Sequence, residues 1–371
     1  MNLPVSETLD IKYLSRLFDN KSESYKLFWF KAIIGIVAKG RTSASYEELV
    51  DAMIGEAWYM VTEYHLNLGP ADTLESLVHY LSRISGLKSS EEKETILEFV
   101  RNCEDKNVSK MKRTLTRNVP YRLQAPFYST LRGQAEWKTS ERNLIWKIRQ
   151  EKRLIYYIGE LSGLDTRIEI QDEWFPYLYE NQEILSGWIN FNLITYLQKR
   201  NPNVPGISDK LNAPQERKME KAKAYWKLVA EIEPLKEIYG NQLVAPGEIS
   251  LDHFIPWSYV ANDELWNLHP TTKSINSRKG NFLPDWDRYF HRLADVEFHG
   301  YQSVWKYEKI HQAFDKCCRE HVNSADVRYR LYREGLEFEM FKQTLKEIML
   351  PVYQAAHNMG FRNWVYREAD K

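Results

Sequence analysis

The sequence predicts a mainly α protein, with α+β character only where short segments favour strands. Apolar residues recur with helical spacing through most of the 371-residue chain. Strand-like runs are confined to residues 154–158 and 166–170, which we expect to pair as a hairpin, and to the apolar run that ends at Leu251. A hydrophobic fraction of 43% and an aromatic fraction of 13% are typical of folded chains and exclude a disordered one.

Residues 1–106 are predicted to form a helical N-terminal domain. Two helices are expected to begin at about Ser24 and Ser45, and they are ended by Gly40 and Gly69. Two more are expected from Ala71 to Ile84 and from Ser90 to about Cys103. The first of them carries three adjacent aromatic residues, Phe28, Trp29 and Phe30. At helical spacing such residues are more often buried than partner-binding, so we interpret them as core.

Residues 107–240 are predicted to form a mixed α+β middle region with a basic surface. The chain has no net charge, but residues 107–153 hold 12 Lys/Arg against 3 Asp/Glu, with aromatics between them. We interpret the block as a phosphate-tracking surface, and a solvated helix face is the alternative. Arg113, Arg117 and Arg122 are the candidate DNA-binding residues, and Arg122 ranks first because it lies beside a proline turn. The other cations of the block are Lys110, Lys112, Arg132, Lys138, Arg142, Lys147, Arg149, Lys152 and Arg153.

Further helices are expected on both sides of Asn201-Pro-Asn-Val-Pro-Gly206, a loop that we predict as a domain boundary. They span about residues 173–200 and 213–233, and then 284–298, 301–322 and 336–357. The last part, residues 291–371, is predicted to be a C-terminal helical region.

The most informative stretch lies between these helices, at residues 249–284. Asp252 and His253 follow the apolar run, so a carboxylate and an imidazole stand at an expected strand end. Asn267 comes 15 residues after Asp252, and Asn276 comes 9 residues later in a segment of helix-like composition closed by Gly280. Each residue alone is more typical of a turn, a loop or a helix surface. Their combination at these separations favours a functional interpretation.

The stretch resembles the HNH nuclease motif, the ββα-metal finger, in the Asp-His…Asn…Asn variant of the HNH domain in RNA-guided CRISPR effector nucleases. The resemblance implies a small ββα-metal finger, which we place at residues 241–290. It also implies a metal-dependent endonuclease that hydrolyses phosphodiester bonds in DNA with one metal ion. Prokaryotic restriction or anti-phage defence is the setting that the resemblance implies.

By this resemblance, Asp252 and Asn276 are the metal ligands and His253 is the general base. On a strand, neighbouring residues point to opposite sides, so Asp252 and His253 serve one site only if the strand ends or bends there. The ordinary pKa of histidine, about 6.5, suits a base at neutral pH. Asn267 is expected to hold the long loop through side-chain hydrogen bonds and so to orient the histidine. Oxygen ligands of this kind suit Mg²⁺ or Mn²⁺.

Two basic residues follow Asn276. Lys279 lies three residues later, on the same helix face, and is expected to contact a phosphate oxygen. Arg278 is a weaker nucleic-acid candidate. His269, close to Asn267, is expected to lie in a loop without a required role.

Alternatives to the DNA endonuclease remain at this stage. The chain could be a catalytically gated or inactive nucleic-acid-binding subunit of a larger complex, or an RNA-directed nuclease. One finger cuts one strand, so double-strand cleavage would need a homodimer or two successive nicks, and a partner protein is the candidate activator of a gated nuclease. Cys103, Cys317 and Cys318 do not form a four-cysteine zinc site or a disulfide framework. The sequence begins without a signal-peptide pattern and has no long apolar run, so we expect a cytoplasmic protein without a membrane partner.

Overall fold

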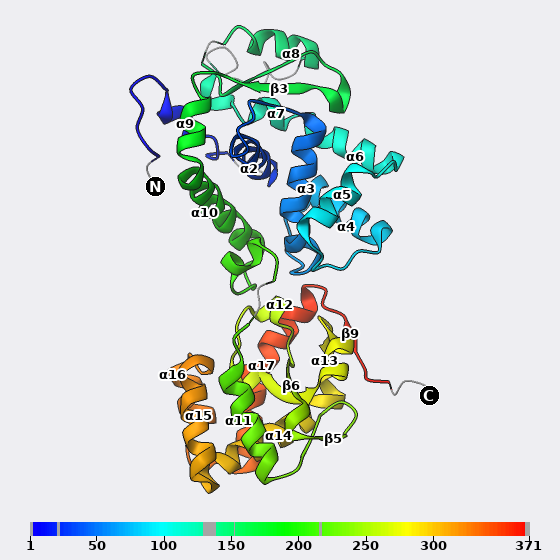
Figure 1. Cartoon of the computed structure of the whole chain (residues 1–371), viewed down its shortest axis with the longest axis vertical. Helices are drawn as coiled ribbons and strands as arrows, with labels where there is room; N and C mark the ends of the chain where they lie inside the picture. The colour runs from blue at the N-terminus through cyan, green and yellow to red at the C-terminus, as the bar shows by residue number, and fades with distance from the viewer. Residues whose placement is uncertain (1–2, 21–22, 129–138, 152, 215–216, 368–371) are drawn as a thin grey trace. The chain divides into compact units, whose positions relative to one another are not determined.

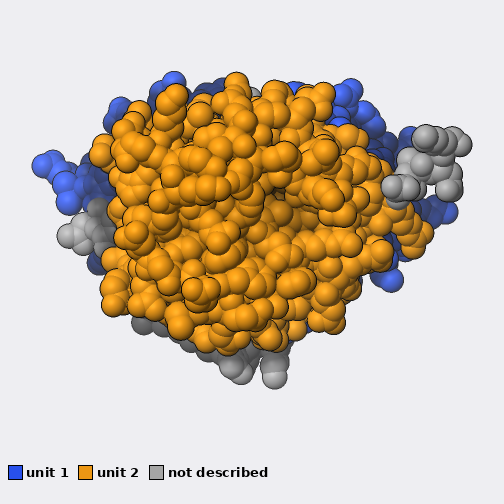
Figure 2. All heavy atoms as spheres, turned by 90° about the horizontal axis from the view of Figure 1, so that it is seen from below, with its two compact units in different colours: residues 1–202, 211–213 blue, residues 203–210, 214–371 orange. Residues whose placement is uncertain are grey.

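The protein, described by a computed structural model, consists of two units (Figures 1 and 2). Unit 1 comprises residues 1–202 and 211–213, and unit 2 comprises residues 203–210 and 214–371. The structure describes every residue except 1–2, 21–22, 129–138, 152, 215–216 and 368–371. The chain first leaves unit 1 after Pro202, inside the loop that was predicted as a domain boundary.

Unit 1 is a helical assembly with one small sheet (Figure 1). Ser45 and Glu48 form a capping box at the start of α3, which explains why the helix begins there. Phe28, Trp29 and Phe30 are fully buried, so their interpretation as core is confirmed. The helices are α1 (Ile11–Leu14), α2 (Tyr25–Val37), α3 (Tyr46–Thr62), α4 (Thr73–Ser85), α5 (Lys93–Arg101), α6 (Lys106–Thr116), α7 (Val119–Arg122), α8 (Glu141–Ile148), α9 (Phe175–Glu180) and α10 (Gln182–Arg200), with 3-10 turns η1 (Ala125–Phe127) and η3 (Gly163–Asp165).

The sheet of unit 1 contains the predicted hairpin and one further strand. β2 (Tyr156–Ile158) pairs antiparallel with β3 (Arg167–Ile170), which confirms the hairpin. β1 (Ser43–Ser45) pairs with the other edge of β3 and was not predicted. Three residues with two serines carry no alternating apolar pattern, so only the pairing itself makes this segment a strand.

Unit 2 contains longer helices around several two-stranded sheets. With 59% of the structure helical and all sheets small, the mainly α fold is confirmed. The elements of unit 2 are η4 (Ile207–Leu211), α11 (Glu220–Ile232), β4 (Leu235–Lys236), β5 (Leu243–Val244), η5 (Pro246–Glu248), β6 (Ile249–His253), α12 (Trp257–Val260), η6 (Leu265–Asn267), β7 (Leu268–Thr272), α13 (Lys273–Lys279), β8 (Leu283–Pro284), α14 (Trp286–Lys306), α15 (Glu308–His321), α16 (Ala325–Leu331), α17 (Phe338–Asn358) and β9 (Asn363–Trp364).

The break between two helices of unit 2 was predicted at the wrong place. It was expected at residues 299–300, but α14 continues through Gly300 to Lys306. A Cβ atom at Gly300 would lie 2.7 Å from the Tyr225 hydroxyl and 2.8 Å from the Trp226 ring, both in α11. This glycine therefore permits the close approach of α14 to α11 instead of ending the helix.

The predicted ββα unit is present in unit 2. β6 and β7 pair antiparallel, with Asp252 opposite His269, and α13 packs against both strands. The Thr272 side chain accepts a hydrogen bond from the Ile275 amide at the start of α13, and Gly280, with a φ of 51°, follows its end. Within the part of the chain that is described, no helix is both long and apolar enough to cross a membrane.

Candidate active site

Asp252 is the centre of a buried polar cluster on one side of β6. Asp252 is only 3% exposed. The Tyr239 hydroxyl donates a hydrogen bond to Oδ2 at 2.6 Å, and the Lys279 ammonium donates one to Oδ1 at 3.0 Å. His269 Nε2 lies 3.6 Å from Oδ2. The carboxylate is therefore engaged at both oxygens by groups of its own chain.

Burial shifts the pKa values of the three side chains that contact the Asp252 carboxylate, Tyr239, His269 and Lys279. Burial raises the pKa of Tyr239 well above its ordinary value, so the phenol keeps its proton and acts as the donor. Burial lowers the pKa of His269 to about 4, so this imidazole is neutral at pH 7. Burial also lowers the pKa of Lys279, and the adjacent Asp252 carboxylate opposes that effect. Lys279 Nζ and Asp252 Oδ1, 3.0 Å apart, form the ion pair of the cluster.

His253 is the last residue of β6, and its ring has a different set of partners. Nε2 lies 2.8 Å from Asp263 Oδ1, and Nδ1 lies 3.0 Å from Arg217 Nη1. A guanidinium can only donate hydrogen bonds, so Nδ1 must be the acceptor. The ring proton therefore sits on Nε2 and is donated to Asp263.

Burial lowers the pKa of His253; Asp263 opposes this shift and Arg217 adds to it. The neutral imidazole, with its lone pair on Nδ1, is the form that a general base requires. β6 ends at His253, so the strand end that one shared site requires is present, while the joint action of Asp252 and His253 stays a prediction.

Asn267, the residue before the start of β7, is hydrogen-bonded to the loop after His253. Its side-chain oxygen accepts from the Ile255 amide at 2.8 Å, and its Nδ2 donates to the Ile255 carbonyl at 2.9 Å. Its own carbonyl accepts from the Phe254 amide at 2.9 Å. These are bonds of the kind expected from the sequence, while the contribution of Asn267 to catalysis stays a prediction.

Asn276 and Lys279 lie one turn apart on the face of α13 that packs against β6. Asn276 Nδ2 donates to the Leu251 carbonyl at 2.8 Å and to Ser250 Oγ at 3.1 Å. Lys279 Nζ also donates to the carbonyl of His253 at 2.7 Å. Among the described residues, no hydrogen bond uses Asn276 Oδ1, so this oxygen is available as a ligand beside the strand that carries Asp252.

The loop that carries Asp263 is held by the C-terminal helices of unit 2. The Asp263 carbonyl lies 2.8 Å from His321 Nδ1, at the end of α15. The Glu264 carboxylate accepts hydrogen bonds from the backbone amide and the side-chain amide of Asn323, at 3.1 Å and 2.6 Å. Residues about 60 positions further along the chain thus determine where the partner of His253 lies.

The comparison with protein families agrees with this geometry. The sequence model of the HNH endonuclease family matches residues 235–285. These residues are an HNH domain. The match is to HNH endonucleases in general and does not single out the RNA-guided effectors. No curated protein and no solved structure matches the chain.

The HNH domain gives the protein an endonuclease assignment at the level of the family and implies a nucleic-acid substrate. HNH nucleases generally use divalent metal ions. Within the described residues, no group of three or more His, Cys, Asp and Glu side chains could hold a metal ion. The predicted ligands are one carboxylate, Asp252, and one amide oxygen, Asn276. Hard oxygen donors in small number fit Mg²⁺, which keeps most of its water ligands.

The structure brings five predicted residues together in and around the HNH domain: Asp252, His253, Asn267, Asn276 and Lys279. Lys279 is 1% exposed and bonded to the predicted metal ligand, so its contact with a phosphate stays a prediction. Arg278 is exposed and points elsewhere: its guanidinium bonds to the Arg367 carbonyl and lies 5.0 Å from the Tyr366 ring centre.

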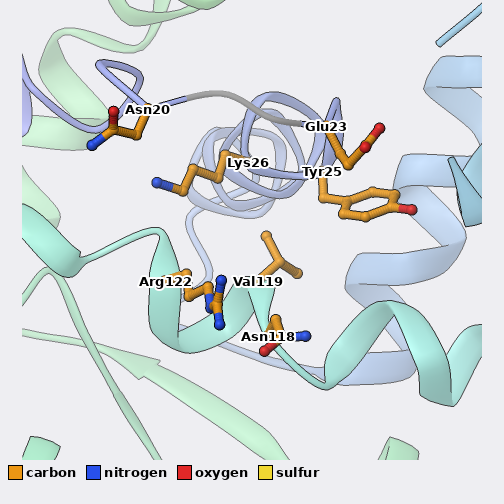
Figure 3. Close-up of a pocket in the computed structure, with 7 residues that line it drawn as sticks. All are labelled: Asn20, Glu23, Tyr25, Lys26, Asn118, Val119 and Arg122. Atoms are coloured by element: carbon orange, nitrogen blue, oxygen red, sulfur yellow. The ribbon is translucent and has the colours of Figure 1, made fainter. Parts of the chain in front are cut away.

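Arg113, Arg117 and Arg122 lie in unit 1 and are exposed. Figure 3 shows Arg122 at a pocket of about 200 Å³ that Lys26 also lines. Burial lowers the pKa of Lys26, and the positive charge of Arg122 lowers it further. The same pocket is lined by Asn20, Glu23, Tyr25, Asn118 and Val119.

Not every cation of the basic block faces solvent. Lys112 is 2% exposed and forms a 2.7 Å ion pair with Asp51, so its inclusion in a phosphate-tracking surface was wrong. Arg132, Lys138 and Lys152 lie outside the described residues. The block is therefore only partly a surface feature.

Sequence reasoning missed several residues of the site. His269 lies in β7, fully buried against Tyr239, and not in a loop as expected. Tyr239 and Asp263 occur in segments whose composition is ordinary for loops. Arg217 falls in the helix predicted over about residues 213–233, but it precedes α11, which begins at Glu220. Only the position of Asp263, ten residues after His253 in the same loop, could have drawn attention to it.

Proposed function

We propose that the protein is a metal-dependent DNA endonuclease that hydrolyses phosphodiester bonds at the HNH domain. The observation that best supports this proposal is the pairing of His253 with Asp263. It holds a neutral imidazole with its lone pair on Nδ1, next in sequence to the buried carboxylate of Asp252.

In this proposal, His253 Nδ1 takes a proton from the attacking water. The resulting hydroxide forms a bond to phosphorus, and the bond from phosphorus to the 3′ oxygen breaks. The products are a 3′-hydroxyl, which takes a proton from solvent, and a 5′-phosphate. Asp263, which accepts from Nε2, stabilises the imidazolium that forms.

Asp252 and Asn276 would hold Mg²⁺ or Mn²⁺ through the carboxylate and Oδ1. The ion, when bound, neutralises charge on the scissile phosphate. Asn276 is suited to this because both of its side-chain hydrogen bonds to described residues use Nδ2, which fixes the side chain and leaves Oδ1 unused. Asn267 positions His253 by fixing the loop through Ile255.

A plasmid assay tests the proposal. Purified protein is incubated with supercoiled plasmid and with Mg²⁺, Mn²⁺ or EDTA. We expect open circles or linear products with metal and none with EDTA. His253→Ala should lower the rate by about 10²–10⁴-fold, because general-base catalysis is lost. His291→Ala is the matched control, since this histidine of α14 is exposed and its ion pair is with Asp295 in its own helix.

Loss of cleavage in both histidine variants, or cleavage that survives EDTA, would contradict the assignment. The ratio of open circles to linear products reports whether one strand or both are cut. The same assay with single-stranded RNA decides between DNA and RNA. A lower plating efficiency of phage on cells that express the protein, restored by His253→Ala, would support a role in restriction or anti-phage defence.

A second candidate, a gated nuclease, is favoured by a specific observation. Asp252 is engaged by Tyr239 and Lys279, and His253 Nδ1 is covered by Arg217. A protein in this arrangement binds nucleic acid without cutting until a partner or the substrate rearranges the site. Binding of plasmid without cleavage, under every metal condition above, would support this candidate.

The proposal also assigns DNA contacts to Arg113, Arg117 and Arg122. Arg122→Gln should weaken DNA binding uniformly across sequences and reduce the salt dependence of the affinity by about one phosphate contact. Arg16→Gln is the control, because this exposed arginine of unit 1 is paired with Asp19 and lies outside the basic block. An unchanged salt dependence of the affinity would show that Arg122 does not contact a DNA phosphate.

A further inference from the structure

Arg217 lies against the catalytic histidine although it is outside the residues that match the HNH family. Its Nη1 atom is 3.0 Å from His253 Nδ1 and 3.8 Å from Asp263 Oδ1. The guanidinium also lies 5.6 Å from the centre of the Trp257 ring. About a third of the side chain, 34%, is exposed. Arg217 is therefore held at the site from one side and open to solvent from the other.

This position of Arg217 conflicts with the proposed role of His253 as the general base. Because Nε2 donates to Asp263, Nδ1 is the only ring atom that can take a proton from water. Arg217 donates to that same atom, and a lone pair engaged by the guanidinium cannot at the same time take the proton of a water molecule. The base is correctly oriented but covered.

A phosphodiester is the chemical group that would draw Arg217 away from His253. A guanidinium has five N–H donors in a planar fork, and a phosphate accepts two of them at once with full opposite charge. The neutral imidazole nitrogen accepts only one and carries no charge. Asp263, at 3.8 Å from Nη1, is too distant for a hydrogen bond and holds Arg217 only weakly.

We propose that Arg217 is a substrate-phosphate contact that covers the base lone pair of His253 until a phosphodiester engages its guanidinium. The inference rests on the proposed function and adds its regulation. When Arg217 moves to the phosphate, the bond from Nε2 to Asp263 is untouched, so the base is uncovered without losing its orientation. Base exposure is thereby coupled to phosphate binding.

Nitrogen-15 NMR of the histidine rings tests this coupling directly, in a full chain labelled at histidine and kept in EDTA. His253 is assigned by comparison with His253→Gln. In the free protein we expect the tautomer protonated at Nε2, with the Nδ1 resonance shifted by an accepted hydrogen bond. A DNA duplex of about 20 base pairs should move Nδ1 toward the position of a free lone pair.

Three variants test whether Arg217 itself causes the change at His253 Nδ1. In Arg217→Ala, Nδ1 should already have the uncovered resonance and should not respond to the duplex. Arg217→Lys, which keeps the charge but not the fork, should restore part of the response. Arg333→Ala, an exposed arginine elsewhere in unit 2, should behave as the wild type. A wild-type Nδ1 resonance in Arg217→Ala, or no response to the duplex in the wild type, would overturn the proposal.

Plasmid cleavage with Mg²⁺ provides an independent measurement. Arg217→Ala should lower kcat/KM by about 100-fold through the lost phosphate contact, and Arg217→Lys by less. Cleavage by Arg217→Ala at the wild-type rate would refute the phosphate contact. If the wild type cuts with no metal, the proposed function is wrong, and the response of Nδ1 to the duplex still decides whether phosphate uncovers this nitrogen.

Discussion

Lys112 in unit 1 and Lys279 in unit 2 are both buried lysines that pair with a buried aspartate. The ion pairs measure 2.7 Å to Asp51 and 3.0 Å to Asp252, and the two lysines are 2% and 1% exposed. Both lysines come from sequence segments that we interpreted as phosphate-binding. By distance, charge and burial alone, the two pairs would be assigned the same role.

Their neighbours differ. The Lys112 ammonium also contacts a second carboxylate, Glu47, and the Val100 carbonyl, all within the helices α3, α5 and α6. Lys279 also contacts the carbonyl of His253, and its aspartate contacts Tyr239 and His269. A base and an amide oxygen thus surround only the second pair. What a buried ion pair does is decided by the groups beside it.

The largest difference should appear when each aspartate becomes an amide. Asp252→Asn keeps the shape of the side chain but removes the charge of the proposed metal ligand, so cleavage should fall by about 10³-fold or more. Asp51→Asn should leave cleavage per folded molecule unchanged. Plasmid assays on both variants, with folding checked by circular dichroism, make the comparison. Equal cleavage activity of the two variants would contradict the different roles assigned to the two ion pairs.

Lys112→Met should destabilise unit 1 by about 3–5 kcal/mol, because Asp51 is left buried without its counter-charge. Burial already raises the pKa of Asp51, and Lys112 opposes this, so the variant raises that pKa further. Between the unfolded and the raised folded pKa, the folded state binds more protons, and its stability falls as pH rises. Urea unfolding should therefore show a smaller difference from wild type at about pH 4 than at pH 8. A larger difference at the lower pH would contradict this account.

Lys279→Met should lower the stability of the protein, and bound metal ions should restore it. Asp252 keeps the hydrogen bond from Tyr239, and a cation bound with Asn276 can replace the lost charge. Addition of Mg²⁺ at about 100 times its dissociation constant should stabilise the variant by about 2.7 kcal/mol, and the wild type by less, because there Lys279 competes. The midpoint of thermal unfolding with and without EDTA measures this. Adding Asn276→Leu to the variant should reduce the shift.

The smallest effects concern two buried amides with similar bonding. Gln124 in unit 1 accepts from the amides of Ile155 and Tyr156 and donates to the Tyr156 carbonyl, much as Asn267 bridges Ile255 in unit 2. Gln124→Leu and Asn267→Leu should each cost about 1–3 kcal/mol of stability. Only Asn267→Leu should also lower plasmid cleavage, because only its loop leads to the base. Urea titration and the plasmid assay are run on the same preparations.

The HNH domain was predictable from sequence because its contacts are local. The two strands and the helix of the ββα unit follow one another within about 30 residues, so the spacing of Asp252, Asn267 and Asn276 is a direct consequence of the fold. The hairpin of unit 1 was predictable for the same reason. β1 was not, because a three-residue strand exists only through its distant partner.

The sequence by itself therefore determined the fold class, the position of the ββα unit and the identity of the residues at its ends. Tertiary structure alone decided what surrounds them. Arg217, His321 and Asn323 reach the site from 36 to 59 positions away in the chain, and no local pattern distinguishes them from surface residues. The same holds for Lys112. Whether a cation faces solvent or a buried carboxylate depends on how helices pack, and packing brings together residues whose separation in sequence carries no periodic signature.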